Sequence, residues 1–379
     1  MTKRVLQIIP TLDRAGAEKQ MTLLARQLPR REFEVQVCAL TRGGPLLTDL
    51  HQAGIPTTVI GKRWKLDPQA YWHLKRLVAR FRPDLIHTWL FAANSYGRAA
   101  GIACGVKCLV AGERCVDPWK GWTELSIDRY LARRTDRIAA NSTAVRDFYV
   151  RHGLPAEKFT VIPNGVPPAE PSRSSRQILL AELGLPEDAR LIGAVGRLWP
   201  QKRLKDAIWA ADLLKVIRND VHLLIAGDGP HRDRLRRFRD QVEIRDKVHF
   251  LGHRDDVPRL MPHFDVLWST SGYEGQSNAI LEAMAAGVPV VATDIPAPAT
   301  WSSTSRPATW SPPAISTPSA SAPRLPGTPN GCSTTPIWPS SSAKPPAAAC
   351  SRSSAWRRWW PALRNCIGRC WTERSRCQT

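Results

Sequence analysis

The stretch DVLWSTSGYEGQSNAILEAMAAGVPVVATD, residues 265–294, contains the pattern that decides the fold. Two short apolar runs, DVLWST (265–270) and PVVATD (289–294), flank a segment of helix length that begins near Gln276. This order predicts a strand, a helix and a second strand. A strand, a crossover helix and a further strand typically form a parallel unit, so we expect an α/β fold.

The same alternation of short apolar runs and longer amphipathic segments extends outward from this stretch to residue 4. The first half contains six predicted strands: VLQIIP (5–10), EVQVCAL (34–40), TTVIG (57–61), DLIHTW (84–89), KCLVAG (107–112) and RIAANS (137–142). The second half adds three before the quoted stretch: RLIGAVGRL (190–198), VHLLIAGDG (221–229) and KVHFLGH (247–253). Helix-length segments such as PQAYWHLKRLVARF lie between them, which indicates doubly wound sheets. Two such domains in tandem typically bind a ligand between the carboxyl ends of their strands.

The boundary between the two halves follows VIPNGV (161–166), where the chain becomes rich in Pro and Ser. Such composition is typical of a linker. We therefore divide the chain into an N-terminal Rossmann-like domain (1–170), a linker (171–188), an incomplete C-terminal Rossmann-like domain (189–296) and a low-complexity tail (297–379).

The tail departs from the alternating pattern near Pro298. It is rich in Pro, Ser and Ala, has no periodicity, and holds seven of the fifteen tryptophans. We expect it to be disordered and the second domain to be truncated, although a natural disordered tail is usually poor in aromatics. If the reading frame is moved back by one base, the codons of residues 299–312 are compatible with the protein sequence RDLVVDVATGYLVP. Those of residues 365–372 are compatible with ELYRALLD. We hypothesise a frameshift near codon 298; sequencing the gene tests it, and an intact upstream frame would refute it.

The net charge of +21 is shared between the tail and the rest of the chain. Residues 297–379 hold ten Lys and Arg against one acidic residue, which is +9 and leaves +12 for residues 1–296. A basic protein favours an anionic ligand or an anionic membrane surface. Because the core lacks a known basic and aromatic nucleic-acid module, we expect no nucleic-acid partner.

The cysteines and the apolar runs indicate an intracellular protein that needs no structural metal site. The cysteines before the tail lie in or beside apolar runs and lack paired zinc spacing, so we interpret them as reduced structural thiols. The apolar start VLQIIPTL is short and no run approaches the roughly 20 residues of a membrane span. We expect a cytoplasmic location, with peripheral contact at the inner face of the plasma membrane as an option.

Two glutamates in the opening stretch are the strongest candidates for chemistry. Glu274 follows a predicted strand, and Glu282 comes after seven further residues, inside the predicted helix. The amino terminus of that helix has free amides and forms a ready anion site. A solvated cap and a solvated helical charge are the alternative, although Glu282 has apolar neighbours among which an unpaired carboxylate is costly.

A basic loop and a small-residue turn also follow predicted strands. In GRLWPQKR, Gly196 lets the backbone approach a ligand, while Arg197 and Lys202 suit diphosphate oxygens. An ordinary basic surface is the alternative. TLDRAGAEKQM places Gly16 in a turn without the dinucleotide fingerprint or a P-loop, so a close approach of substrate is the better interpretation than NAD or ATP. We interpret IAGDGP (225–230) as a structural turn.

These segments, in this order, resemble family 4 of the retaining GT-B glycosyltransferases, the glycosyltransferase group 1. The resemblance spans residues 4–296 and rests on AGAE, DLIHTW, ANS, VIPNGV, GRLWPQKR, IAGDGP, FLGHRDDVP and EGQSNAILEAMAAGVPVVATD. It implies two Rossmann-like doubly wound domains that face a cleft. The first would bind the acceptor and the second a nucleoside-diphosphate sugar. The family also continues past Asp294 with a strand and a helix that the shifted reading supplies.

The resemblance implies roles for individual residues. Arg197 and Lys202 would hold the donor diphosphate, Glu282 the ribose, and Glu274 the sugar hydroxyls or developing charge. The implied donor-binding set is Gly16, Gly196, Arg197, Lys202, His253, Arg254, Glu274, Gly275, Gln276, Ser277, Asn278 and Glu282, with His253 and Arg254 near the base. The catalytic candidates are Glu274, Arg197, Lys202 and His87. Where the family often has a histidine, this chain reads GERCVDPW, so acceptor chemistry falls to His87, Glu113 or Arg114. The alternative for His87 is a satisfied buried histidine at a strand end.

The implied reaction transfers a sugar to an acceptor hydroxyl with retention, in polysaccharide or glycolipid synthesis of the cell envelope. We expect no cofactor and no metal, because no suitable Asp-x-Asp occurs and Asp255 with Asp256 fits a turn and a helix start. The acceptor would be a carbohydrate or a lipid-linked sugar, and the basic segments HLKRLVARFR and RYLARR would lie on an anionic membrane or simply be solvated. The alternatives are an epimerase or phosphorylase of the same fold, a nucleic-acid-binding protein, and an inactive product of a damaged gene.

Overall fold

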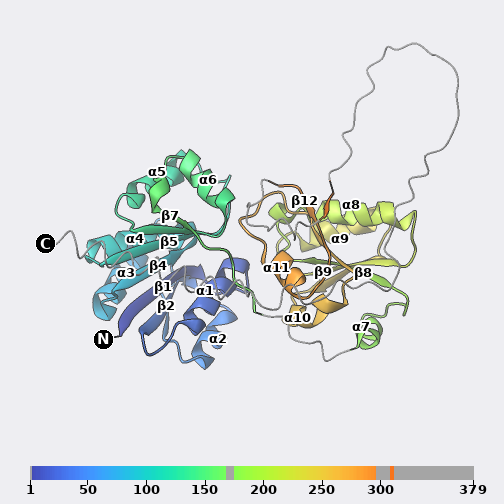
Figure 1. The fold of residues 1–379 in the computed structure, drawn as a ribbon, viewed down its shortest axis with the longest axis horizontal. Helices are drawn as coiled ribbons and strands as arrows, with labels where there is room; N and C mark the ends of the chain where they lie inside the picture. The colour runs from blue at the N-terminus through green and yellow to red at the C-terminus, as the bar shows by residue number, and fades with distance from the viewer. Residues whose placement is uncertain (1, 168–174, 296–307, 311–379) are drawn as a thin grey trace, which may run out of the picture.

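The computed structural model describes residues 2–167 and 175–295, together with the backbone of residues 308–310. Two lobes lie side by side, and each is built on a parallel sheet (Figure 1). No helix in the two long described ranges is both long and apolar enough to cross a bilayer. The α/β fold with two doubly wound domains is therefore confirmed.

The first lobe has a seven-stranded parallel sheet in the order β3-β2-β1-β4-β5-β6-β7. Its strands are β1 (Lys3–Thr11), β2 (Phe33–Arg42), β3 (Thr57–Val59), β4 (Leu85–Trp89), β5 (Cys108–Glu113), β6 (Arg137–Ala140) and β7 (Phe159–Val161). Its helices are α1 (Gly16–Gln27), α2 (Leu46–Gln52), α3 (Pro68–Phe81), α4 (Leu90–Ala103), α5 (Trp122–Ala132) and α6 (Thr143–Arg151), with a short 3₁₀ turn η1 (Ala156–Lys158). The strand order reverses direction between β1 and β4, which is where doubly wound sheets open a ligand crevice.

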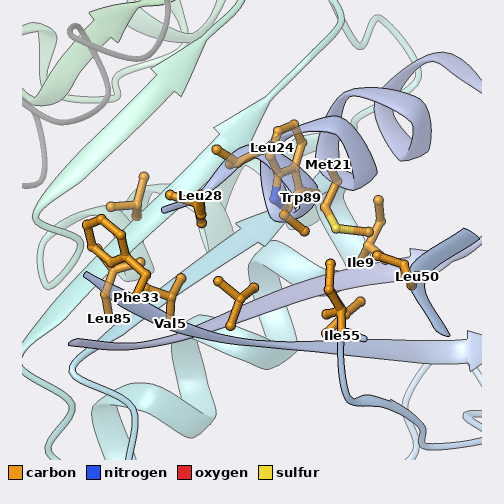
Figure 2. Close-up of a cluster of buried hydrophobic side chains, with 14 of the residues drawn as sticks. Val5, Ile9, Met21, Leu24, Leu28, Phe33, Leu50, Ile55, Leu85 and Trp89 are labelled. Atoms are coloured by element: carbon orange, nitrogen blue, oxygen red, sulfur yellow. The ribbon is translucent and has the colours of Figure 1, made fainter. Parts of the chain in front are cut away.

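Alternating side chains of β1 bury the two faces of this sheet under different helices. Val5 and Ile9 pack in one cluster with Leu24 of α1, which Figure 2 shows in close-up. Leu6 and Ile8 point to the other face and belong to a separate cluster that includes residues of α3 and α4. This near-continuous apolar run is what a parallel strand covered on both faces requires.

The second lobe has a six-stranded parallel sheet in the order β10-β9-β8-β11-β12-β13. Its strands are β8 (Arg190–Val195), β9 (Val221–Ala226), β10 (Val248–Gly252), β11 (Val266–Ser269), β12 (Val290–Thr293) and β13 (Ala308–Trp310). Its helices are α7 (Arg176–Glu182), α8 (Leu204–Lys215), α9 (Arg232–Gln241), α10 (Val257–Leu260) and α11 (Asn278–Ala285), with 3₁₀ turns η2 (Pro200–Lys202) and η3 (Met261–His263). The quoted stretch 265–294 therefore forms β11, α11 and β12.

The structure differs from the sequence expectations at three places. The short strand β7 was not predicted, because three residues give no periodic signal. Helix α11 begins at Asn278 and not near Gln276. The expected linker 171–188 contains α7, whose first turn is capped by the hydroxyl of Ser175. The proposed frameshift and the disorder of the tail fall on residues that, apart from the backbone of β13, lie outside the described ones.

Candidate functional site

The loop after β8 is shaped by close backbone packing against the turn after β9. Gly196 and Gly227 both have positive φ, 151° and 150°. A Cβ atom on Gly227 would lie 1.9 Å from the carbonyl oxygen of Gly196, so no other residue fits there. The amide of Leu198 also donates to the carbonyl of Asp228 at 3.0 Å. The IAGDGP turn therefore supports the loop that carries Arg197 and Lys202, in agreement with its structural interpretation.

Lys202 and Glu274, which are 72 positions apart in the sequence, form an ion pair between the loops after β8 and β11. The hydroxyl of Ser271 also donates to the Glu274 Oε1 atom at 2.8 Å. The hydroxyl of Thr270 donates to the backbone carbonyl of Lys202 at 2.8 Å, which ties the two loops together. Both side chains are largely buried, so a charge placed beside them is poorly screened.

Arg197 lies in the same loop as Lys202, with its side chain exposed. Its guanidinium lies 4.8 Å from the centroid of the Trp199 ring, a cation–π contact that orients it. It also interacts electrostatically with Glu18 of α1 in the other lobe. Two cations therefore stand at the carboxyl edge of the second sheet, where doubly wound domains bind phosphates.

Helix α11 lies on the side of the second lobe that is nearest α1 (Figure 1), and its first residue, Asn278, contacts the other lobe. Its N-cap Ser277 makes no side-chain cap, so first-turn amides remain available to an anion. The Nδ2 atom of Asn278 donates to the carbonyl of Gly16 at 3.2 Å. Burial raises the pKa of Glu282 in the same helix, and Lys19 of α1 opposes that shift. The structure thus brings Gly16 to the start of α11.

Asn164, from the segment after β7, joins the two lobes through both of its polar groups. Its backbone amide donates to Gln276 Oε1 at 2.5 Å, and its Nδ2 atom donates to the Gln276 carbonyl at 3.1 Å. Nδ2 also donates to Asn278 Oδ1 at 2.6 Å, while Arg114 donates to the Asn164 Oδ1 atom. These bonds hold Gln276 outside the helix, which explains why α11 begins two residues late. Sequence reasoning missed Asn164; its only signal was the VIPNGV motif at the domain boundary.

Gly275 presses directly against the first lobe. A Cβ atom there would lie 2.2 Å from the carbonyl oxygen of Arg114 and 2.5 Å from Asn141 Oδ1. Asn141 is itself fixed, because its Nδ2 atom donates to the same carbonyl at 2.9 Å. The loop that carries Glu274 is therefore seated on a rigid shelf formed by Arg114 and Asn141.

We predict that Gly275→Ala lowers kcat/KM by about 100-fold, because a shift of about 1 Å in a positioned group has that effect. The methyl group meets a backbone carbonyl that cannot rotate away. Gly272→Ala is the matched control in the same loop, since its Cβ would meet the flexible side chain of Arg203 at 3.0 Å. Steady-state kinetics with thermal unfolding measures both, and near wild-type kinetics for Gly275→Ala would contradict the seating.

Glu18 is a buried carboxyl that faces the basic loop. Burial raises its pKa from the usual 4.5 to about 7, and nearby Asp13 adds to this; the hydroxyl of Thr11 and the charge of Arg197 act in the opposite direction. Below pH 7 Glu18 is therefore mostly neutral, and above pH 7 it is an anion close to Arg197. An anionic ligand at Arg197 binds more favourably when Glu18 is protonated.

We predict that affinity for a sugar nucleotide falls as the pH rises from 6 to 8, by at most about tenfold per pH unit for one coupled proton. Glu18→Gln should remove the dependence, whereas Glu34→Gln, an exposed change on β2, should leave it. Titration calorimetry with a nucleoside-diphosphate sugar suits this test because the diphosphate diester of such a compound does not titrate in that range. A Glu18→Gln profile as steep as that of wild type would exclude this carboxyl as the cause.

The residues expected near the base lie elsewhere on the same edge of the sheet, after the outer strand β10. Arg254 is bound to Asp256 through two hydrogen bonds of 2.7 Å. His253 is exposed and lies 3.1 Å from Asp255, which also pairs with Arg14 of the other lobe. Asp256 occupies the N-cap position of α10, in line with the predicted turn and helix start, but its carboxylate binds Arg254 and makes no capping hydrogen bond. These side chains are not part of the cluster around Lys202 and Glu274.

His87 is buried in β4 and stacks against Trp89 at a centroid distance of 4.5 Å. Burial and the charge of Arg114 lower its pKa to about 3, so it is neutral at physiological pH. Its Nε2 atom has no hydrogen-bond partner among the described residues. The guanidinium of Arg114 lies over the Trp89 ring, 5.1 Å from its centroid. His87 therefore belongs to the first lobe's buried edge and not to the Lys202 and Glu274 cluster.

The comparisons with known proteins agree with this arrangement. Residues 14–170 match the family described as Glycosyltransferase Family 4, and residues 175–301 match Glycosyl transferases group 1. The chain is 26% identical over 317 residues to the UDP-Gal:alpha-D-GlcNAc-diphosphoundecaprenol alpha-1,3-galactosyltransferase of Escherichia coli, covering 76% of this chain and 78% of the relative. It is 29% identical to the putative glycosyltransferase EpsF of Bacillus subtilis, covering 77% and 79%.

A solved structure with the same architecture is that of Anabaena HepE in complex with UDP and glucose. Its TM-score is 0.68 at 26% identity, and the match covers 77% of this chain and 81% of that protein. The structure of WaaG, a glycosyltransferase involved in lipopolysaccharide biosynthesis, matches with a TM-score of 0.58 at 20% identity and supports the fold alone. With one family matched on each lobe, the chain belongs to the group 1 glycosyltransferases of family 4 and is a hexosyltransferase-type enzyme with the GT-B fold.

Proposed function

We propose that this protein transfers a hexose from a UDP-sugar to a hydroxyl group of a carbohydrate or lipid-linked acceptor, with retention, in the synthesis of a polysaccharide or glycolipid. The observation that carries the proposal is the pairing of Lys202 with Glu274 beside Arg197 and the open amino terminus of α11. The choice of UDP is supported by HepE, whose structure holds UDP and glucose, and by the E. coli relative, whose name specifies UDP-Gal.

The proposed chemistry needs stabilisation of charge more than a strong base. As the glycosidic bond breaks, negative charge develops on the diphosphate and positive charge on the sugar ring. Arg197, Lys202 and the first-turn amides of α11 face the diphosphate. Glu274 then turns from Lys202 to the sugar hydroxyls or the developing ring charge, and Glu282 binds the ribose. The donor phosphate takes the acceptor proton, while the two cations and the helix amides stabilise the leaving diphosphate in place of a metal.

The acceptor would reach this centre from the first lobe. Glu113 is the last residue of β5, and Arg114 directly after it forms part of the shelf on which Gly275 rests. Burial raises the pKa of Glu113 to about 7, an effect that Lys120 opposes. For a lipid-linked acceptor, the basic surface of α3 and α5 would bring this lobe to an anionic membrane.

A donor screen on the full chain tests the proposal. We expect a UDP-hexose to raise Tm more than GDP- or ADP-sugars do, and Glu282→Ala to remove the shift. Labelled donor should give transfer to an added acceptor, with the anomeric configuration of the product read by NMR and the rate insensitive to EDTA. Release of epimerised free sugar, or no shift with any sugar nucleotide, would overturn the proposal. A frame-restored version assayed in parallel tests whether the tail sequence limits activity.

A further inference from the structure

A group of large apolar side chains is exposed on the first lobe. Trp64 is 69% exposed, Leu66 81%, Trp119 57% and Trp122 78%. We call these four residues the aromatic rim. Isolated exposed apolar residues are common, but several together mark a surface that contacts another molecule.

The rim is assembled from segments that are far apart in the sequence. Lys65, between Trp64 and Leu66, forms a 2.9 Å ion pair with Glu124 in the first turn of α5. The ring of Trp119 packs edge-on against Phe91 at the start of α4, with centroids 5.7 Å apart. These segments follow β3, β4 and β5, so the rim lies at the carboxyl edge of the first sheet. This is the edge from which an acceptor must approach the cleft.

Charge on the two lobes is distributed very unequally. Residues 2–167 hold 26 Lys and Arg against 14 Asp and Glu, whereas residues 175–295 hold 17 of each. The net positive charge of these two ranges therefore lies entirely on residues 2–167, the lobe that carries the rim. Positive charge on one lobe alone orients the molecule toward an anionic surface.

The charges next to the rim are also predominantly positive. Lys62, Arg63 and Lys65 flank Trp64, and Lys65 is 84% exposed even though it pairs with Glu124. The nearby carboxylate of Asp117 accepts a 2.7 Å hydrogen bond from Tyr149 and lies 3.5 Å from the buried Lys120. Asp117 and Glu124 are thus engaged, whereas the cationic side chains of Arg63 and Lys65 are exposed.

We propose that the aromatic rim inserts into the headgroup region of an anionic bilayer, so that the acceptor edge of the first lobe rests on the membrane. Tryptophan side chains concentrate at membrane interfaces, and exposed Lys and Arg add attraction to anionic lipids. A protein partner would require complementary acidic groups of fixed geometry, whereas a bilayer requires only this combination of aromatic and basic residues. The inference deepens the proposed function and rests on it only for the lipid-linked acceptor.

Vesicle co-sedimentation of the full chain tests the proposal, with phosphatidylcholine vesicles that contain or lack phosphatidylglycerol. We expect binding to the anionic vesicles, which added salt weakens. Trp64→Ser with Trp122→Ser should weaken it by about 100-fold, about tenfold for each buried ring. The control is Trp209→Ser, an exposed tryptophan of α8 on the neutral lobe, which should bind within about twofold of wild type. Lys62→Glu with Arg63→Glu should weaken binding to the anionic vesicles.

The thermal shift with UDP, measured without vesicles, separates the two proposals. An unchanged shift in the double tryptophan variant shows that the donor lobe is folded, and a wild-type near-UV circular dichroism spectrum shows that the first lobe is folded, so loss of vesicle binding then supports the rim. Wild-type binding by that variant, or equal loss in Trp209→Ser, would overturn the membrane proposal. Wild-type protein that shows the UDP shift but binds no vesicle would also overturn it, while leaving the donor proposal standing. Vesicle binding without any UDP shift would overturn the donor proposal alone.

Discussion

Lys202→Met is expected to lower kcat/KM by about 1,000-fold, because removing one charge-stabilising donor from a preorganised site typically costs 100- to 1,000-fold. The effect should lie at the upper end of this range. Lys202 is ion-paired with the largely buried Glu274, so its loss leaves an uncompensated carboxylate beside the donor diphosphate. Steady-state kinetics with a UDP-sugar and an acceptor measures the effect.

The matched control for this change is Lys215→Met. Lys215 is the last residue of α8, which begins just after the Lys202 loop, and a helix of 12 residues places its ends roughly 16 Å apart. We expect less than about a twofold change, as for a charge beyond the Debye length. Lys202→Met with Glu274→Gln removes the uncompensated charge and should recover donor binding but not kcat. Wild-type kinetics for Lys202→Met alone would exclude Lys202 from the mechanism.

Asp128→Ala is expected to destabilise the first lobe by about 3–5 kcal/mol, which is the usual result of breaking a buried ion pair from one side. Asp128 is fully buried and binds Arg98 at 2.6 Å and Lys120 at 2.9 Å. Both cations are also buried, and the next carboxylate, Glu113, is 3.6 Å from Lys120. The variant leaves two cations with too little compensation. Denaturant unfolding measures the loss, and Tm should fall by about 10 °C.

An exposed ion pair of the same lobe gives the comparison. Arg146 and Asp147 are neighbours with side chains 41% and 52% exposed. We expect Asp147→Ala to change stability by less than about 0.5 kcal/mol, because solvated pairs contribute little. Equal effects of Asp128→Ala and Asp147→Ala on unfolding would show that the buried cluster does not stabilise the lobe.

The sequence was sufficient for elements whose signals are local. Helix α3 spans the predicted residues 68–81, because Asp67 caps it, Pro68 occupies its first turn and Arg82 ends it in a left-handed conformation before Pro83. The strands other than β7 and β13 were predicted because their apolar runs are near-continuous, as parallel strands covered on both faces require. For the same reason the loops with Arg197, Lys202 and Glu274 could be placed at the ends of strands from sequence alone.

The sequence could not show which loops meet. Asn164 binds the carbonyl of Gln276, which lies outside α11. Only glycine fits at position 227, because the carbonyl of Gly196, 31 positions earlier, lies against it. Neither contact leaves a periodic signal in the sequence. Glu18 and Asp128 look like ordinary helical acids in the sequence, and only burial beside particular partners gives them unusual electrostatics. The aromatic rim likewise depends on the ion pair between Lys65 and Glu124, which come from segments far apart in the sequence.

The sequence by itself determined the α/β class, the order of the elements and the residue types that a diphosphate would need, because these depend on spacing within a few turns of chain. Only the tertiary structure decided that Lys202 pairs with Glu274, that Gly275 rests on Arg114, and that the exposed Trp64 and Trp122 come from segments joined by an ion pair on the basic lobe. The physical reason is that burial and pairing depend on distances between remote segments, and those distances are fixed only when both sheets have formed.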